Sequence, residues 1–316
     1  MIQVPILIIA YNRPRSLGRL LMALESLKTR RVFISIDGPS SENQHSNQQV
    51  FEKASEWKSL SRHEVTIVRR NRNVGIYDHL PKALSDFFAS NAYGIILEDD
   101  IEFVPNFIDF VDRHYGLLDT ESLWSICGHN PAAQPNPPTD VDVQLTFRPS
   151  IFHSIWGWAT SKKNAEIFLN DYHLNIDLNE AFVILERTSR GITRDPLLQR
   201  AFVLTWMRKL SGWNIRRKLS GWDTRWAYEG WKAGKLSLLP DISLSRECLD
   251  QSEGQTHQHK TVSAKDLFAY DTKAIFEKRF ADRSAEIRRM RTWGISRRYS
   301  WFYSKRIARQ LKDFIQ

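Results

Sequence analysis

Three consecutive carboxylates, Glu98, Asp99 and Asp100, directly follow the apolar run GIIL at residues 94–97. Such a run is typical of a buried strand, and like charges at its end repel one another and are costly to bury dry. A positive partner removes that cost. Carboxylate oxygens bind Mn²⁺ or Mg²⁺, and such a metal commonly bridges two phosphates of a nucleotide. The alternative is that the aspartates form an ordinary turn in solvent.

The elements around the triplet alternate between strand and helix patterns through the first 130 residues. Strands are predicted at residues 4–10, 31–36, 64–68 and 94–97, and helices at 14–27, 42–59, 76–90 and from 105 onward. This order predicts an α/β fold with a mostly parallel sheet and helices on both faces.

Polar residues follow three of the predicted strands. Arg13 comes after the first strand, Asp37 after the second, and the acidic triplet after the fourth. Ligands of open α/β sheets bind at the carboxyl ends of the strands. The sequence therefore predicts that these side chains share one site.

The segment LEDDIEFVPNFIDFV, residues 97–111, resembles the metal-binding segment of glycosyltransferases with the GT-A fold. The resemblance is strongest to the inverting N-acetylglucosaminyltransferases that start complex N-glycans and to similar, family 2-like bacterial sugar transferases. AYNRP and SIDG resemble the turns after the first two strands of that family. The resemblance implies a Rossmann-like GT-A domain and a nucleotide-sugar donor.

The resemblance also implies roles for individual residues. Asp100 would be the direct metal ligand, Asp99 would bind the ribose, and Glu98 would support the cluster. Arg13 would face the diphosphate, for which its fixed fork of donors is suited. Asp37 would accept the uracil N3 hydrogen.

Each of these positions also has a plainer interpretation. Arg13 could be an exposed loop residue, and Asp37 a turn residue before Gly38. His79 aligns loosely with a nucleotide-contacting histidine of the family, and a histidine on a helix surface is the alternative.

An inverting transfer needs a carboxylate that removes a proton from the acceptor hydroxyl. SGWDTRW, residues 220–226, resembles the segment that supplies this base in the family, so Asp223 is the predicted base. The alternative is that Asp223 caps a helix that runs to about Lys232. The hexapeptide RKLSGW occurs at 208–213 and at 217–222, and only the second copy precedes an aspartate.

Two further segments resemble parts of the family. SIWGWATS, residues 154–161, carries Trp156 and Trp158, which could offer flat faces to a pyranose or fill the core. The stretch 236–258 ends near His257, which would contact the metal or a phosphate. The polar run 251–260 could close over the donor as a lid.

The basic charge of the chain is concentrated at its end. The formal net charge is +9, and residues 272–316 hold 13 Lys and Arg against 4 Asp and Glu, with aromatic residues interleaved. This composition suits an anionic membrane surface. A helix pair packed on the main domain is the equal alternative, and nucleic-acid binding is less favoured because no recognised motif accompanies the charge.

The two cysteines, Cys127 and Cys248, have no metal-like spacing, so neither a disulfide framework nor a zinc site is expected. The run VPILIIA near the start is too short to span a membrane. These features fit a cytoplasmic protein, with peripheral contact at the inner membrane face if the tail binds lipid.

Three regions are predicted: a nucleotide-sugar half at 1–135, an acceptor and catalytic half of the same GT-A domain at 136–265, and a basic helical tail at 266–316. The predicted enzyme is a hexosyl- or N-acetylhexosaminyltransferase that uses Mn²⁺ or Mg²⁺ and a UDP-sugar. Its acceptor would be a glycan or a lipid-linked saccharide, as in bacterial surface polysaccharide synthesis.

Two other functions fit parts of the sequence. A nucleotidyltransferase would share the sheet and the metal, but the turn YNRPRSLG lacks the glycine-rich run expected of that class. A non-enzymatic carbohydrate- or membrane-binding protein would explain the 11 tryptophans and the basic tail, but not the acidic triplet.

Overall fold

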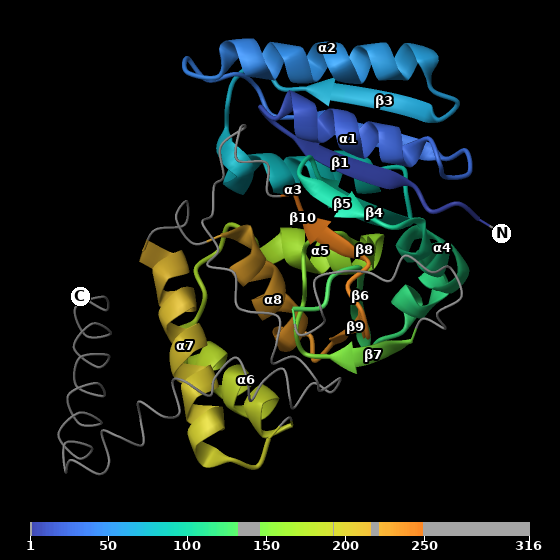
Figure 1. Ribbon diagram of the computed structural model, residues 1–316. Coiled ribbons are helices and arrows are strands. Elements are labelled where there is room, and N and C mark those ends of the chain that lie inside the picture. The colour runs from blue at the N-terminus through green and yellow to red at the C-terminus, as the bar shows by residue number, and fades with distance from the viewer. Residues whose placement is uncertain (1, 132–145, 192, 216–220, 249–316) are drawn as a thin grey trace.

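The computed structural model describes residues 2–131, 146–191, 193–215 and 221–248. These residues form one large sheet with helices on both faces (Figure 1). The mixed α/β architecture and mostly parallel sheet predicted from the sequence are present. The predicted boundary at residue 135, His257 and the basic tail lie outside the described residues.

The described elements alternate as the sequence patterns predict. The strands are β1 (Ile6–Ala10), β2 (Arg31–Ile36), β3 (Glu64–Arg69), β4 (Tyr93–Glu98), β5 (Ile101–Phe103), β6 (Leu123–Cys127), β7 (Phe147–Ser150), β8 (Trp158–Ser161), β9 (Leu236–Pro240) and β10 (Ser245–Glu247). The helices are α1 (Pro14–Leu24), α2 (Gln44–Leu60), α3 (Gly75–Phe88), α4 (Pro105–His114), the 3₁₀ helix η1 (Tyr115–Asp119), α5 (Lys162–Asp171), α6 (Leu178–Arg190), α7 (Pro196–Ile215) and α8 (Trp222–Lys232). The four predicted strands and four predicted helices of the first half are confirmed, with ends shifted by a few residues.

The large sheet has the order β3-β2-β1-β4-β8-β6-β9-β7. The first four strands in this order are mutually parallel, and β8 is antiparallel to both of its neighbours, β4 and β6. Strands from the predicted nucleotide half and the predicted acceptor half therefore belong to one continuous sheet. β5 and β10 form a separate antiparallel ribbon.

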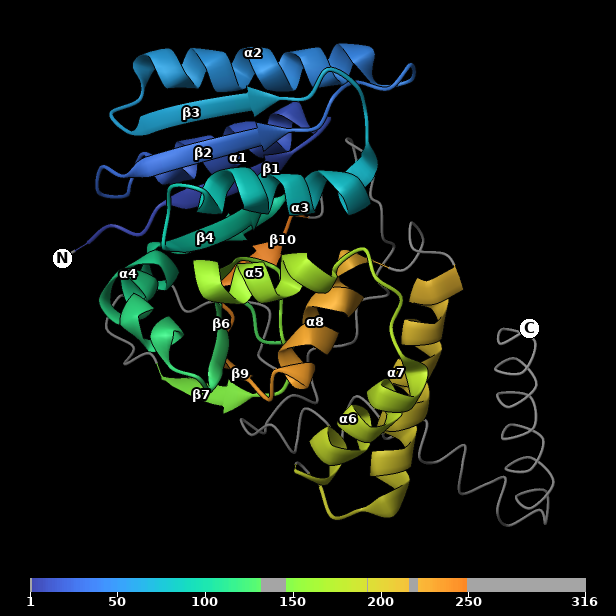
Figure 2. The same cartoon turned by 180° about the vertical axis from the view of Figure 1, so that it is seen from behind.

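Both faces of the sheet are buried, which explains the continuous apolar runs in the strands. In β1, Ile6 and Ile8 face a core that includes side chains of α1, α2 and α4, whereas Leu7 and Ile9 face a core that includes α3 and α5–α8. Figure 2 shows α3 and α5 on the near side, with α1 behind the strands and α2 along the top beside β3.

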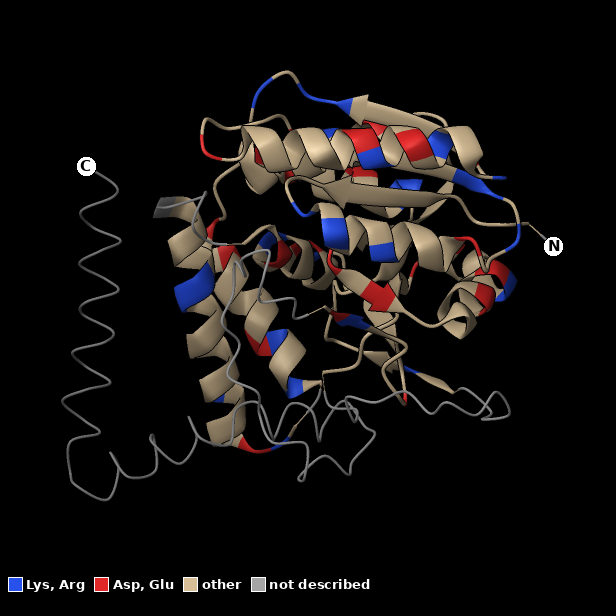
Figure 3. Ribbon diagram, turned by 45° about the horizontal axis from the view of Figure 1, so that its top comes forward, with Lys and Arg blue, Asp and Glu red and all other residues tan. Residues whose placement is uncertain are grey.

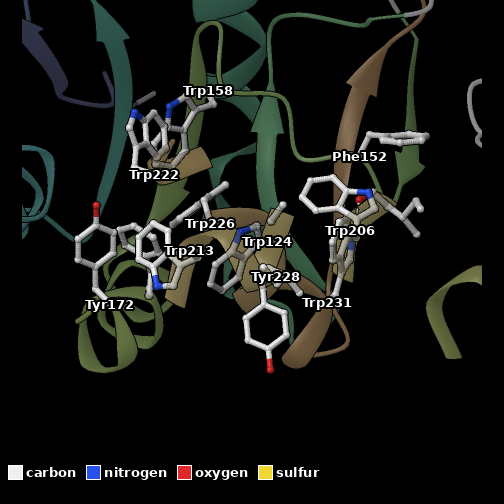
Figure 4. Packing of buried hydrophobic residues seen from close by; sticks show 14 of the residues in the cluster. Trp124, Phe152, Trp158, Tyr172, Trp206, Trp213, Trp222, Trp226, Tyr228 and Trp231 are labelled. Atoms are coloured by element: carbon white, nitrogen blue, oxygen red, sulfur yellow. Dashed lines mark hydrogen bonds between the residues drawn. The ribbon is translucent and has the colours of Figure 1, made fainter. Parts of the chain in front are cut away.

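Most of the tryptophans in the second half build the second of these cores (Figure 4). The ring of Trp226 lies 4.4 Å from that of Trp158 and 4.5 Å from that of Trp124. Trp158 is only 1% exposed, so the core interpretation is correct for this residue and it offers no face to a sugar. The two copies of the duplicated hexapeptide end in Trp213 and Trp222. Both of these tryptophans are buried in the same aromatic cluster.

Cys127 is buried and Cys248 is partly exposed, and both are free thiols. Within the described part of the chain, no helix is both long enough and apolar enough to cross a membrane.

Candidate active site

The acidic triplet lies at the carboxyl end of β4, in the middle of the large sheet. The backbone N–H of Asp99 donates to the carbonyl of Ile9 at the end of β1, which brings the triplet beside the turn after that strand (2.9 Å). After the triplet the chain enters β5, and the N–H of Cys248 donates to the Asp100 carbonyl at 2.6 Å. Both aspartates are buried, and Glu98 is partly buried.

Arg13 reaches the triplet from the turn between β1 and α1. Its Nη1 donates to Asp99 Oδ1 at 3.2 Å and also forms an ion pair with Asp100 Oδ2. The backbone N–H of Tyr11 donates to the other carboxylate oxygen of Asp99 at 3.0 Å. The sequence therefore placed Arg13 correctly at the edge of the sheet, where it is a partly buried partner of the carboxylates and not an exposed loop residue.

Two carboxylates of the triplet, Glu98 and Asp99, have raised pKa values, because burial disfavours their charged forms. Burial, followed by the charges of Asp100 and Asp99, raises the pKa of Glu98 to about 8. Burial also raises the pKa of Asp99 to about 7, although Arg13 opposes this shift. Burial alone would lower the pKa of Arg13, but the two aspartates outweigh it and raise that pKa. A second cation in this site would favour the charged carboxylates.

Asp37 follows β2 and accepts hydrogen bonds from the loop before α3. Its Oδ1 accepts from the N–H of Gly38 at 2.8 Å, and its Oδ2 accepts from the N–H of Gly75 at 2.9 Å and from Asn73 Nδ2 at 3.1 Å. Asp37 thus ties the loop to the end of β2. Its predicted contact with uracil stays a prediction, and the structure adds this bracing role, which the sequence analysis missed.

His79 is 1% exposed and lies in α3 with its Nδ1 3.9 Å from Asp37 Oδ1. The expectation of a surface histidine is wrong, because the imidazole faces the sheet and its Nε2 lies 3.2 Å from the Ser35 carbonyl. Burial lowers the pKa of His79, although Asp37 opposes this shift. The structure therefore brings His79 and Asp37 together beside the carboxyl end of β2.

Asp223 lies in the first turn of α8, where the positive end of the helix favours a carboxylate. The N-cap position is Gly221, two residues before Asp223, so the interpretation of Asp223 as the N-cap residue is wrong. The charge of Asp223 contributes to the raised pKa of Glu98, but less than burial and the charges of Asp100, Asp99 and Arg13, so Asp223 lies within electrostatic range of the triplet. Trp222 links the start of α8 to β4 through Trp158. The rings of Trp222 and Trp158 lie 6.0 Å apart, and Trp158 pairs with Ile96 of β4.

Gly221 is a residue that the sequence analysis did not single out. A Cβ atom at this position would collide with the carboxylate of Asp223. The glycine is therefore what allows Asp223 its present orientation.

Trp156 is partly buried, and its ring lies 4.5 Å from that of His129. Trp156 lies close to the triplet in space. The adjacent Gly157 lies against Ser245 and against Leu97, the residue directly before Glu98. The structure thus separates the two tryptophans of SIWGWATS: Trp158 is core, and Trp156 lies nearer the candidate site.

The donor set of the triplet consists of hard oxygen ligands, the type that Mn²⁺ and Mg²⁺ prefer. Among the described residues, no group of three or more His, Cys, Asp or Glu side chains could hold a metal unaided. Mg²⁺ characteristically takes only one or two carboxylates and completes its shell with water and substrate phosphates. The residues present therefore fit a metal that arrives with a nucleotide diphosphate.

Residues 1–168 match the GNT-I family, and this match spans all elements from β1 to most of α5. The chain belongs to the GNT-I family. It is accordingly a glycosyltransferase of the GT-A type that resembles N-acetylglucosaminyltransferase I. No curated protein matches the chain.

The GNT-I match includes Arg13, Asp37, His79 and the acidic triplet, but it ends before Asp223 and His257. The role of Asp223 therefore depends on its geometry and on the resemblance of its own segment. The assignment to a glycosyltransferase family favours sugar transfer over nucleotidyl transfer and over a purely binding role.

Proposed function

We propose that the protein transfers a sugar from a UDP-sugar to a glycan or lipid-linked acceptor, with inversion at the anomeric carbon and with the aid of Mn²⁺ or Mg²⁺. The transferred group is a hexose or an N-acetylhexosamine. The setting is bacterial surface polysaccharide synthesis in the cytoplasm, at the inner face of the membrane.

One observation carries the proposal. Three carboxylates lie at the carboxyl edge of the sheet, Arg13 contacts two of them, and burial raises the pKa values of Glu98 and Asp99 to about 8 and about 7. A site with this excess of negative charge is suited to a divalent cation. Arg13 already contacts both aspartates, which is consistent with a requirement for positive charge at this point.

Asp100 would hold the metal, with Asp99 directed to the ribose and Glu98 supporting both. When bound, the metal would neutralise the charge that develops on the departing diphosphate. Arg13 would bind the diphosphate with its fork of donors. Asp37 and His79 would lie at the nucleobase end, beside the loop that Asp37 braces.

Asp223 would remove the proton from the acceptor hydroxyl as its oxygen attacks the anomeric carbon. Its position in the first turn of α8, within electrostatic range of Glu98, supports this role. The predicted donor-site residues lie in the N-terminal part of the described chain, whereas the predicted base lies near its C-terminal end. The predicted contact of His257 with the metal or a phosphate belongs to this proposal as well.

The proposal is tested by calorimetry with UDP, GDP, CMP and dTDP forms, with and without Mn²⁺. We expect one nucleotide class to bind only with the metal, and we expect Asp100→Ala to remove that metal-dependent binding. Asp109→Ala removes an exposed carboxylate of α4 and serves as the matched control, which should bind like the wild type. Metal-dependent binding that survives in Asp100→Ala would contradict the proposed site.

A further inference from the structure

Helix α7 has one buried face and one exposed face of unusual composition. The buried face contributes Leu198, Phe202, Trp206, Leu210 and Trp213 to the aromatic core. Successive members of this set are three or four residues apart, as on one side of a helix. This face of α7 therefore packs on the rest of the domain, and the opposite face is exposed.

The outward side of α7 carries Arg200, Leu204 and Arg208, each four residues after the last and all exposed. The helix contains no Asp or Glu, and Figure 3 shows no red along it. Within the described chain, neither Arg200 nor Arg208 forms an ion pair or a side-chain hydrogen bond. Two unpaired cations flank an exposed leucine on this face.

The neighbouring helix α6 adds exposed apolar side chains and carries no net charge, since it has two glutamates and two arginines. Phe182 is 44% exposed and Val183 is 64% exposed. The carboxylate of Glu186 pairs with Arg190 at 2.7 Å, and that of Glu180 lies 3.8 Å from Lys232 Nζ. The two helices together therefore combine exposed apolar side chains with a net positive charge, which α7 supplies.

The charge of this surface selects its partner. The basic tail at 272–316, with 13 cationic and 4 anionic residues, has the same sign, so it would be repelled from α7. A second copy that presented the same face would be repelled as well. Cations interleaved with apolar side chains are the pattern that binds the interface of an anionic bilayer.

We propose that the outward face of α7 is a docking surface for a membrane that contains anionic lipid. This surface lies within the folded domain and is distinct from the tail. The tail adds charge of the same sign, so both would engage the same leaflet.

Docking through α7 would have a functional consequence, because α7 precedes the helix that holds Asp223. Asn214 in its last turn exchanges two hydrogen bonds with the backbone of Ile176, both at 2.8 Å, and Trp213 packs 5.4 Å from Tyr172. Five residues, 216–220, separate the end of α7 from Gly221, where the described chain resumes and enters α8. The first turn of α8 holds Asp223. Docking of α7 would therefore bring the predicted base close to a lipid-linked acceptor, a consequence that rests on the proposed function, whereas lipid binding itself does not.

The test is co-sedimentation of the full chain with vesicles of phosphatidylcholine, with or without phosphatidylglycerol. Arg200→Glu/Arg208→Glu should weaken binding to the anionic vesicles by at least about tenfold, since each cation near such a surface contributes about 1 kcal/mol. Leu204→Ser should weaken binding at high salt, where the electrostatic part is screened.

The matched control is Lys58→Glu/Arg113→Glu, which makes the same change in net charge on exposed residues of α2 and α4. An equal loss in this control would mean that only total charge matters, and no loss in the α7 variant would mean that α7 does not dock; either result overturns the proposal. It is also overturned if Leu204→Ser binds normally and soluble dextran sulfate competes fully, because the partner is then a soluble polyanion. Metal-dependent nucleotide binding in the same variants is measured separately, so a failure of the proposed function is recognised independently.

Discussion

At the scale of single residues, the site combines groups that oppose one another electrostatically. Glu98, Asp99 and Asp100 repel, and Arg13 compensates only part of their charge. Asp223 adds a further negative charge from α8. Such an arrangement is unfavourable for stability, and sites of this kind are where binding or catalysis is expected.

Asp223→Asn separates the base from the donor site. The amide keeps the size of the side chain but cannot accept the proton of the acceptor hydroxyl, so we expect turnover to fall by about 10²- to 10⁴-fold. The affinity for the nucleotide sugar should stay close to that of the wild type, because the substitution leaves Arg13 and the triplet in place. Steady-state transfer and calorimetry on the same preparation measure both quantities.

A rate near that of the wild type in Asp223→Asn would show that another group is the base. Loss of donor affinity together with rate would show that Asp223 acts on the donor and not on the acceptor.

At the scale of elements, irregular positions are matched by partners elsewhere in the chain. Pro81 lies inside α3 and has no N–H to donate to the carbonyl of Tyr77, four residues earlier. The hydroxyl of Tyr172, at the end of α5, donates to that carbonyl at 2.9 Å instead. The proline is therefore tolerated because a second helix supplies the missing donor, and α3 and α5 are joined as a result.

The start of α8 gives a prediction at this scale. Gly221→Ala should displace the carboxylate of Asp223, because the new Cβ would occupy its place. We expect kcat to fall roughly ten- to a hundredfold, since small misplacements of a catalytic group are costly. The KM for the donor and the melting temperature should change little, because φ at this position is −52°, which alanine adopts readily.

Gly116→Ala is the control for this substitution, because a Cβ there meets no atom within 4 Å and its φ is not positive. A normal kcat in Gly221→Ala would mean that Asp223 has room to keep its place, or that its orientation does not matter for the reaction.

At the scale of the whole molecule, the raised carboxylate pKa values link the site to global stability. The pKa of Glu98 is about 8 in the folded protein against an ordinary value of 4.5, and that of Asp99 is about 7 against 3.8. The folded state therefore binds more protons than the unfolded state between these values. The free energy of unfolding falls as the pH rises through this window.

We expect the melting temperature of the metal-free protein to decrease by several degrees from about pH 5 to about pH 9. Glu98→Gln should show a smaller decrease, because one shifted group is removed while Glu229, whose pKa is raised to about 7, remains. Mn²⁺ with the bound nucleotide should also reduce the decrease, because a cation then replaces the missing protons. Thermal unfolding followed by circular dichroism measures all three, and equal slopes in the wild type and Glu98→Gln would contradict this account.

The sequence alone determined the local elements and the residues that follow them. Apolar runs and helical spacing predicted β1 to β4 and the helices between them, because backbone propensity and burial patterns act over short distances. The position of Arg13 beside the triplet also followed, since parallel strands place their carboxyl ends at one edge.

Only the tertiary structure decided which side chains the packing removes from solvent and which distant segments meet. It placed Trp158 in the core and His79 against Asp37, and it brought Asp223 near Glu98. These outcomes depend on how β8, α3 and α8 pack on the sheet. Contacts between residues far apart in the chain leave no local pattern. The sequence therefore left two interpretations open for each of these residues, and only packing could decide between them.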